Sequence, residues 1–94
     1  MATISDANLL TEIKTRLDIT GTYHDAKLNG YIDDVKNYLI DAGVAENVVN
    51  DSCSIGAICR GVADLWNYGQ GGSFSDYFRE RATQLTFKTL EAET

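Results

Sequence analysis

The sequence has 94 residues, 44% of them hydrophobic and 23% charged, which is the composition of a soluble globular protein with a single domain over residues 1–94. It contains neither an apolar run near the roughly 18 residues of a membrane span nor a basic N-terminal leader, so we expect the chain to stay in the cytoplasm where it is made. The net charge of −6 is spread evenly without a basic stripe, which argues against DNA binding by charge but is compatible with DNA passing nearby.

The first helix is expected from about Asp6 to Asp18. Ser5 is a suitable N-cap residue, because its hydroxyl can accept a hydrogen bond from the first turn. The chain contains no proline, so a glycine has to mark the end of the segment, and Gly21 after Thr20 does so. The apolar residues recur at the spacing of one helix face: Leu9, Leu10, Ile13 and Leu17.

The second helix is expected to begin at Thr22 as the N-cap, with Asp25 three residues later as the acidic partner of a capping box. Asp25 would also place negative charge at the positive end of the helix dipole. Gly43 stands where a left-handed residue closes a helix. The residues predicted to face the core form a continuous stripe: Leu28, Tyr31, Ile32, Val35, Tyr38, Leu39 and Ala42.

A linker or short turn is expected at residues 44–51, with its valines packed back on the core. The third helix should start near Asp51 or Ser52. Gly56 and Gly61 inside this helix each cost about 1 kcal/mol relative to alanine, which indicates either the close approach of another backbone or local flexibility. Its inward-facing residues are predicted from the helical spacing to be Ile55, Ile58, Cys59, Val62 and Trp66.

The fourth helix follows a glycine-rich loop and should be capped by Ser73 or Ser75. Its apolar side is predicted to consist of Phe74, Tyr77, Phe78, Ala82, Leu85 and Phe87. No segment alternates with a period of two for long enough to favour a strand. The predicted fold class is therefore all-α, a small bundle of about four helices joined by short turns, with the glycine-rich loop before the last one.

No group of residues suggests catalysis. The glycine-rich loop lacks the lysine and the preceding strand of a phosphate-binding loop, so it is interpreted as a hinge and turn. His24 is the single histidine and is expected to face solvent. Cys53 and Cys59 are six residues apart on one expected helix, too far for a disulfide, and are interpreted as small buried residues. We expect no enzymatic activity, no cofactor and no metal site.

Five aromatic residues gather around the glycine-rich loop, more than a domain of this size readily buries together with its other rings. All five could instead close the core around the loop, and for Trp66 and Phe78 the core is the favoured interpretation. Tyr68 and Tyr77 are harder to bury, because each phenol needs a polar partner. Aromatic residues beside arginines are enriched in protein–protein interfaces. The residues predicted to contact another subunit or protein are Trp66, Tyr68, Phe74, Tyr77, Phe78, Arg79 and Arg81.

The stretch "CRGVADLWNYGQGGSFSDYFRERATQLTFK", from Cys59 to Lys88, resembles the C-terminal half of the phage head–tail connector family, the head-completion or adaptor proteins of tailed phages. The distinctive blocks are Leu65–Gly69 and Tyr77–Arg81. The opening segments "LLTEIKTRLDI" and "TYHDAKLNGYIDDVKNYLIDAGV" are similar to the family's first pair of helices, so the likeness covers about the whole chain.

The resemblance implies a structural virion protein located at the head–tail junction after assembly in the host cytoplasm. Such a protein forms a homo-oligomeric ring under the portal protein, extends the DNA channel and offers a docking surface to stopper or tail-completion proteins. It also implies no catalysis, no cofactor and no membrane. An acidic chain suits a channel through which DNA passes without being specifically bound.

A small helical DNA-binding or regulatory module is the alternative, because short helices joined by tight turns can form a helix-turn-helix. That reading needs a basic recognition helix. The third expected helix offers only Arg60, and the fourth offers Arg79, Arg81 and Lys88.

Overall fold

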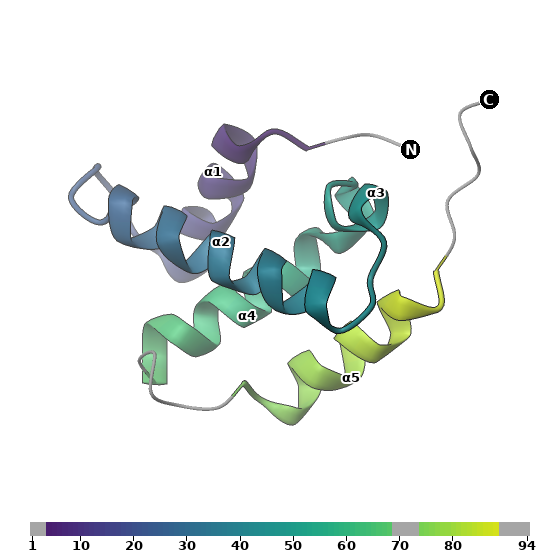
Figure 1. The fold of residues 1–94 in the computed structure, drawn as a ribbon. Coiled ribbons are helices and arrows are strands. Elements are labelled where there is room, and N and C mark those ends of the chain that lie inside the picture. Colours follow the sequence, from purple (N-terminus) through teal and green to yellow (C-terminus); the bar gives the residue numbers. More distant parts are fainter. Residues whose placement is uncertain (1–3, 69–73, 89–94) are drawn as a thin grey trace.

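The computed structural model describes residues 4–68 and 74–88 (Figure 1). Within these residues the chain is helical and contains no β-strand, so the all-α prediction is confirmed. The elements, in chain order, are α1 (Asp6–Leu17), α2 (Asp25–Asp41), α3 (Glu46–Val49), the 3₁₀ turn η1 (Ser52–Ser54), α4 (Ile55–Tyr68) and α5 (Asp76–Thr86). The four longer helices correspond to the four that the sequence predicts. Among the described helices, none combines the length and the hydropathy that crossing a bilayer requires.

Helix α1 begins and ends close to the predicted positions. The Ser5 hydroxyl accepts a hydrogen bond from the Asn8 N–H at 3.1 Å, which confirms Ser5 as the N-cap. The helix closes at Asp18, whose φ of 61° is left-handed, and the Asp18 N–H donates to carbonyls of the last turn. Aspartate tolerates this conformation better than most residues, so the helix ends before Gly21.

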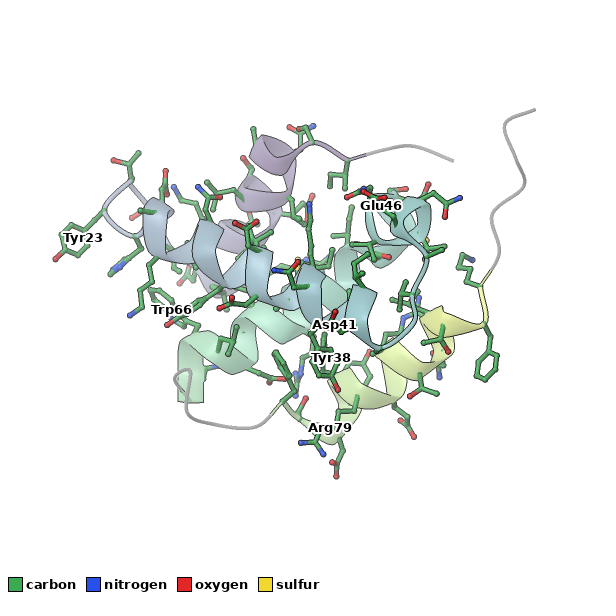
Figure 2. All side chains as sticks on the ribbon, viewed as in Figure 1. Tyr23, Tyr38, Asp41, Glu46, Trp66 and Arg79 are labelled. Carbon is green, nitrogen blue, oxygen red and sulfur yellow. The ribbon has the colours of Figure 1, made fainter. Side chains whose placement is uncertain are left out.

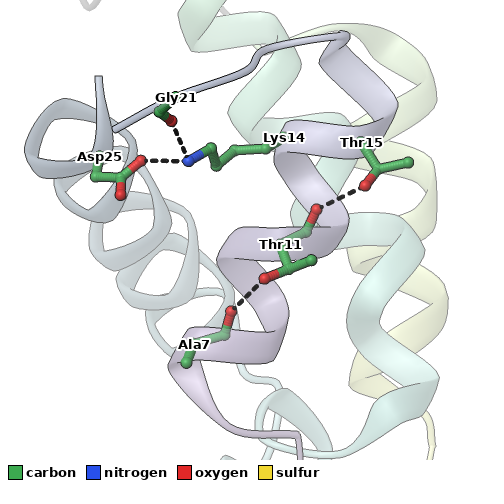
Figure 3. Close-up of polar contacts among 6 residues, drawn as sticks. All are labelled: Ala7, Thr11, Lys14, Thr15, Gly21 and Asp25. Atoms are coloured by element: carbon green, nitrogen blue, oxygen red, sulfur yellow. Dashed lines mark hydrogen bonds and ion pairs between the residues drawn. The ribbon is translucent and has the colours of Figure 1, made fainter. Parts of the chain in front are cut away.

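The start of α2 differs from the prediction. The helix begins at Asp25 with His24 in the cap position and without a side-chain capping bond, so the expected Thr22 capping box is wrong. The Asp25 carboxylate instead pairs with the Lys14 ammonium at 2.8 Å, and Lys14 also donates to the Gly21 carbonyl (Figure 3). A charged pair forms the stronger bond here, and it ties α1 to the first turn of α2.

Helix α4 is the central element, and it contacts α1, α2 and α5. A Cβ atom on Gly61 would lie 2.8 Å from a Phe78 ring carbon and 2.9 Å from the Val35 methyls, so close packing requires glycine there. At Gly56, by contrast, an added Cβ would meet nothing within 4 Å, so close approach does not explain that glycine. The largest side chains sealed in the core are Leu9, Ile13, Leu28, Leu39, Ile58, Phe78 and Leu85.

The segment between α2 and α4 packs on the core as predicted, and it includes the short helix α3. Val44, Val48 and Val49 are buried. Gly43, with a φ of 108°, supplies the left-handed residue expected after α2. This segment therefore closes one end of the bundle.

The chain enters α4 through η1 rather than through a longer helix. The buried Asp51 carboxylate accepts a hydrogen bond from the Cys53 N–H at 2.8 Å, and this bond holds the pKa of Asp51 below its ordinary value. Cys53 lies in η1 and is half-buried, whereas Cys59 is buried in α4, and both thiols are free. Burial raises the pKa of each thiol.

Helix α5 is capped by Ser75, one of the two predicted candidates, whose hydroxyl accepts from the Phe78 N–H at 3.2 Å. The other candidate, Ser73, and the glycine-rich loop of residues 69–72 lie outside the described residues. Phe87 does not join the apolar side as predicted, because α5 ends at Thr86 and the ring is 81% exposed.

Candidate interaction surface

The predicted contact residues that the structure describes do not form one surface but lie in several parts of the molecule. Phe78 lies in the core with no exposed surface, and its ring packs against Phe74 with centroids 4.5 Å apart. Phe74 is partly buried and also meets Tyr38 edge-on at 4.9 Å. Phe78 is therefore corrected from a contact residue to a core residue, and Phe74 mainly covers it. Tyr38, predicted for the core stripe, is 36% exposed.

A second aromatic group lies where the turn between α1 and α2 meets the end of α4 (Figure 2). The His24 ring contacts Trp66 edge-on at 4.9 Å and Tyr23 at 4.8 Å, so the histidine is half-buried rather than solvent-facing. The Lys27 ammonium lies 5.6 Å from the Trp66 ring centre. Trp66 thus keeps a partly exposed edge, while Tyr23 is 90% exposed. The side chain of Tyr68 lies outside the described residues.

The third location is a groove of about 330 Å³ between α1, α4 and α5. Its lining consists of Arg16, Leu17, Gly56, Cys59, Arg60, Ala63, Tyr77 and Arg81. The Tyr77 ring is 61% exposed, and the Arg60 guanidinium covers it at 5.3 Å from the ring centre. Tyr77 and Arg81 are four residues apart on α5 and so lie on the same face of that helix. Tyr77 and Arg81, two of the predicted contact residues, thus line the same groove together with Arg60.

A buried carboxylate fixes the position of Tyr77. Asp64 on α4 is 5% exposed and accepts hydrogen bonds from the Ser75 N–H at 3.0 Å and from the Ser75 hydroxyl at 2.9 Å. Ser75 in turn caps α5 two residues before Tyr77. The Arg60 guanidinium lies 3.7 Å from the same carboxylate. These contacts hold the start of α5 against α4 and set the wall of the groove.

The groove gathers positive charge in a chain whose net charge is negative. Three of the arginines of the sequence line it, and its lining holds no acidic residue among those that the structure describes. Arg16 pairs with Glu12 at 3.6 Å, and Arg81 donates to the Gln84 side chain at 3.0 Å. Pairs between such exposed groups contribute little free energy and exchange readily, so the guanidinium groups can engage another acid. The arrangement is suited to binding an acidic and partly apolar surface.

Arg79, the last of the predicted residues, projects away from the other helices at the lower edge of α5 (Figure 2). It is exposed and does not line the groove. Sequence reasoning had not placed Arg16 or Arg60 at the site, because both approach Tyr77 only through the packing of α1 and α4 against α5. A signal for Arg60 was available in its spacing of four residues from Asp64, which is the spacing of a helical ion pair.

Among the described residues, no three His, Cys, Asp or Glu side chains are grouped so as to hold a metal ion. In the comparison with known proteins, the model of the family described as "Phage gp6-like head-tail connector protein" matches residues 7–87. No curated protein and no solved structure matches the chain. The resemblance seen in the sequence is therefore confirmed at the level of the family, over most of the chain.

Proposed function

The chain belongs to the phage gp6-like head–tail connector family, a family of structural proteins, and we propose that it acts as a ring-forming adaptor beneath the portal. In this role identical copies surround the DNA channel and lengthen it. The ring then offers a surface on which a stopper or tail-completion protein docks. The family implies a location in the virion, and we propose that assembly takes place in the host cytoplasm.

The observation that carries this proposal, beside the family match, is the exposed tyrosine of α5 in its setting of arginines. Tyr77 offers 61% of its surface to a partner, and both Arg60 and Arg81 stand next to it in the groove. Interfaces favour this combination, because a tyrosine provides apolar contact with a polar end and an arginine provides several fixed donors. We assign the subunit and portal contacts to Trp66, Tyr68, Phe74, Tyr77, Arg79 and Arg81.

The charge of the chain supports a channel role as well. With a formal net charge of −6, a ring of many copies is strongly acidic and repels the phosphate backbone at long range. DNA can therefore pass through such a ring without being retained. No specific nucleotide contact is needed for this function.

The test is to measure the mass of the purified protein by native mass spectrometry and sedimentation, alone and with assemblies of a portal protein. We expect a closed oligomer in at least one of these conditions, visible as a ring by electron microscopy. The Tyr77→Ala variant should keep its helical circular dichroism and lose assembly. A chain that stays monomeric at high concentration and does not associate with portal assemblies would overturn the proposal.

The arginines of the groove also favour the alternative function, a DNA-binding or regulatory module, because guanidinium groups can bind phosphates. That function requires phosphate contacts, and hence duplex binding that weakens steeply as salt is added. Fluorescence anisotropy with a labelled duplex at low salt distinguishes the two functions. The adaptor role predicts no binding in the micromolar range, and salt-dependent binding in that range would favour the module.

A further inference from the structure

The groove lies on the side of α4 that is turned away from α2. Gly61 faces Val35 of α2, as the short distances to its added Cβ show. At 3.6 residues per turn, the four α4 residues that line the groove point roughly 160–260° around the helix from Gly61. The groove and α2 therefore occupy opposite sides of α4. Figure 1 gives the view onto α2, with α4 behind it.

The outer face of α2 is acidic. Asp33, Asn37 and Asp41 are spaced four residues apart and are all exposed. They point roughly 160–240° around α2 from Val35, the residue that packs on α4. Ile40, 41% exposed, lies at the edge of this face, roughly 140° around α2 from Val35. One side of the molecule thus carries carboxylates beside an exposed apolar side chain, and the opposite side carries a groove with arginines.

We propose that the arginine groove of one copy binds the outer face of α2 of the next copy. This inference rests on the proposed ring and identifies the two surfaces that meet in it. Because the surfaces differ and lie on opposite sides of α4, the contact is heterologous. A repeated heterologous contact closes into a ring when the rotation between copies divides a full turn, and it otherwise gives an open filament. A two-fold dimer would instead require one surface to match itself.

The chemistry of the two surfaces is complementary. Asp33 and Asp41 are eight residues apart, about 12 Å along the helix axis, and provide two carboxylates for the guanidinium groups at the rim of the groove. Ile40, directly before Asp41 at the edge of this face, offers an apolar side chain to Leu17 and Ala63 in the lining of the groove. The Arg16 and Arg60 side chains are about half exposed, at 51% and 48%, so they can reach a neighbour.

A second copy suits the groove better than a nucleic acid does. The groove is small and has an apolar floor, whereas a duplex needs a long basic surface. The remaining surface of the chain carries an excess of acidic residues, which would repel a phosphate backbone next to the groove. An acidic helix with an exposed isoleucine at the edge of its outer face satisfies both the charge and the apolar lining residues of the groove.

Charge reversal tests the pairing. The groove variant carries Arg16→Glu with Arg81→Glu, and the α2 variant carries Asp33→Lys with Asp41→Lys. All four side chains are outside the core, so both variants should fold, which circular dichroism checks. Under the condition in which the wild type assembles, each variant alone should associate about tenfold or more weakly, since like charges then face each other. An equimolar mixture should recover the oligomer, because each reversed surface meets its reversed partner.

A control carries Lys88→Glu, a charge reversal on an exposed residue that lies beyond the groove and outside the assigned contacts, and it should self-associate like the wild type. If both reversal variants fold and assemble normally, or if their mixture fails to recover assembly, the pairing is wrong while the ring proposal stands. If the wild type assembles neither alone nor on the portal, the ring proposal itself falls. Retention of a labelled DNA duplex by the wild type, lost in the groove variant, would assign the groove to nucleic acid instead.

Discussion

Asp64 and Ser75 join α4 to the start of α5 through two hydrogen bonds that one carboxylate oxygen accepts, from the Ser75 N–H and from its hydroxyl. The same hydroxyl accepts the N–H of Phe78, whose ring lies fully inside the core. A single serine thus satisfies a buried acid and the first turn of a helix together. The position of α5 in the bundle, and with it the position of Tyr77, depends on this connection.

Ser75→Ala should lower the free energy of unfolding by about 1–3 kcal/mol, because the helix loses its cap and a buried carboxylate loses a donor. Urea denaturation followed by circular dichroism measures this loss. Ser75→Thr keeps the hydroxyl and should remain closer to the wild type. A loss below about 0.3 kcal/mol for the alanine variant would mean that the connection does not stabilise the fold.

Gly61→Ala should destabilise the protein by about 1–3 kcal/mol, since the new methyl would press on Phe78 and Val35 in a filled core. Gly30→Ala is the control, because Gly30 lies within α2 and an added Cβ meets nothing within 4 Å. That variant should gain up to about 1 kcal/mol from helix propensity. Thermal denaturation of both variants gives the comparison, and equal shifts in the same direction would contradict the packing argument.

Leu39→Ala should cost about 2–5 kcal/mol of stability, because the leucine has no exposed surface and its removal leaves a cavity. Tyr77→Ala should change stability far less, since more than half of that ring faces solvent. The two variants, measured by the same chemical denaturation, separate a core residue from a surface residue. If Tyr77→Ala unfolds the protein as readily as Leu39→Ala does, the tyrosine is a core residue and the proposed contact surface is wrong.

We expect the protein to lose stability in acid because of Asp51. Its pKa in the folded chain lies below the ordinary value of 3.8, because the Cys53 N–H donates to the charged carboxylate. The stabilising contribution is therefore complete above pH 3.8 and disappears as the pH falls through the lower, folded-state pKa. Asp51→Asn should show a weaker dependence of the melting temperature on pH in this range. Identical pH profiles for the variant and the wild type would exclude the contribution of Asp51.

The helices could be predicted because their signals are local. Ser5 and Gly43 mark ends that the structure confirms, and the apolar spacing gave most of the core. The start of α2 was wrong for a non-local reason: Asp25 pairs with Lys14, eleven residues earlier, instead of completing a capping box. A propensity for a local bond does not reveal a stronger partner that another helix supplies.

The candidate site was predicted only in part, because exposure depends on how the helices pack. Tyr77 and Phe78 are neighbours in the sequence and both aromatic, yet one is exposed and the other is sealed in the core. Spacing on one helix cannot decide between them until α4 is placed beside α5. The presence of Arg16 in the groove is even harder to predict from the sequence, because Arg16 lies on α1 and reaches the groove only when α1 packs beside α4 and α5.

Arg60 links the groove to the start of α5. Its guanidinium covers the Tyr77 ring in the groove and lies 3.7 Å from the Asp64 carboxylate, which holds α5 through Ser75. A protein that binds at Tyr77 therefore also restrains the first turn of α5, through the Arg60 guanidinium. By thermodynamic reciprocity, a neighbour that binds there makes this turn open less often, and a firmer turn binds the neighbour more tightly. Slower exchange of the Phe78 amide hydrogen would accompany each new copy that joins.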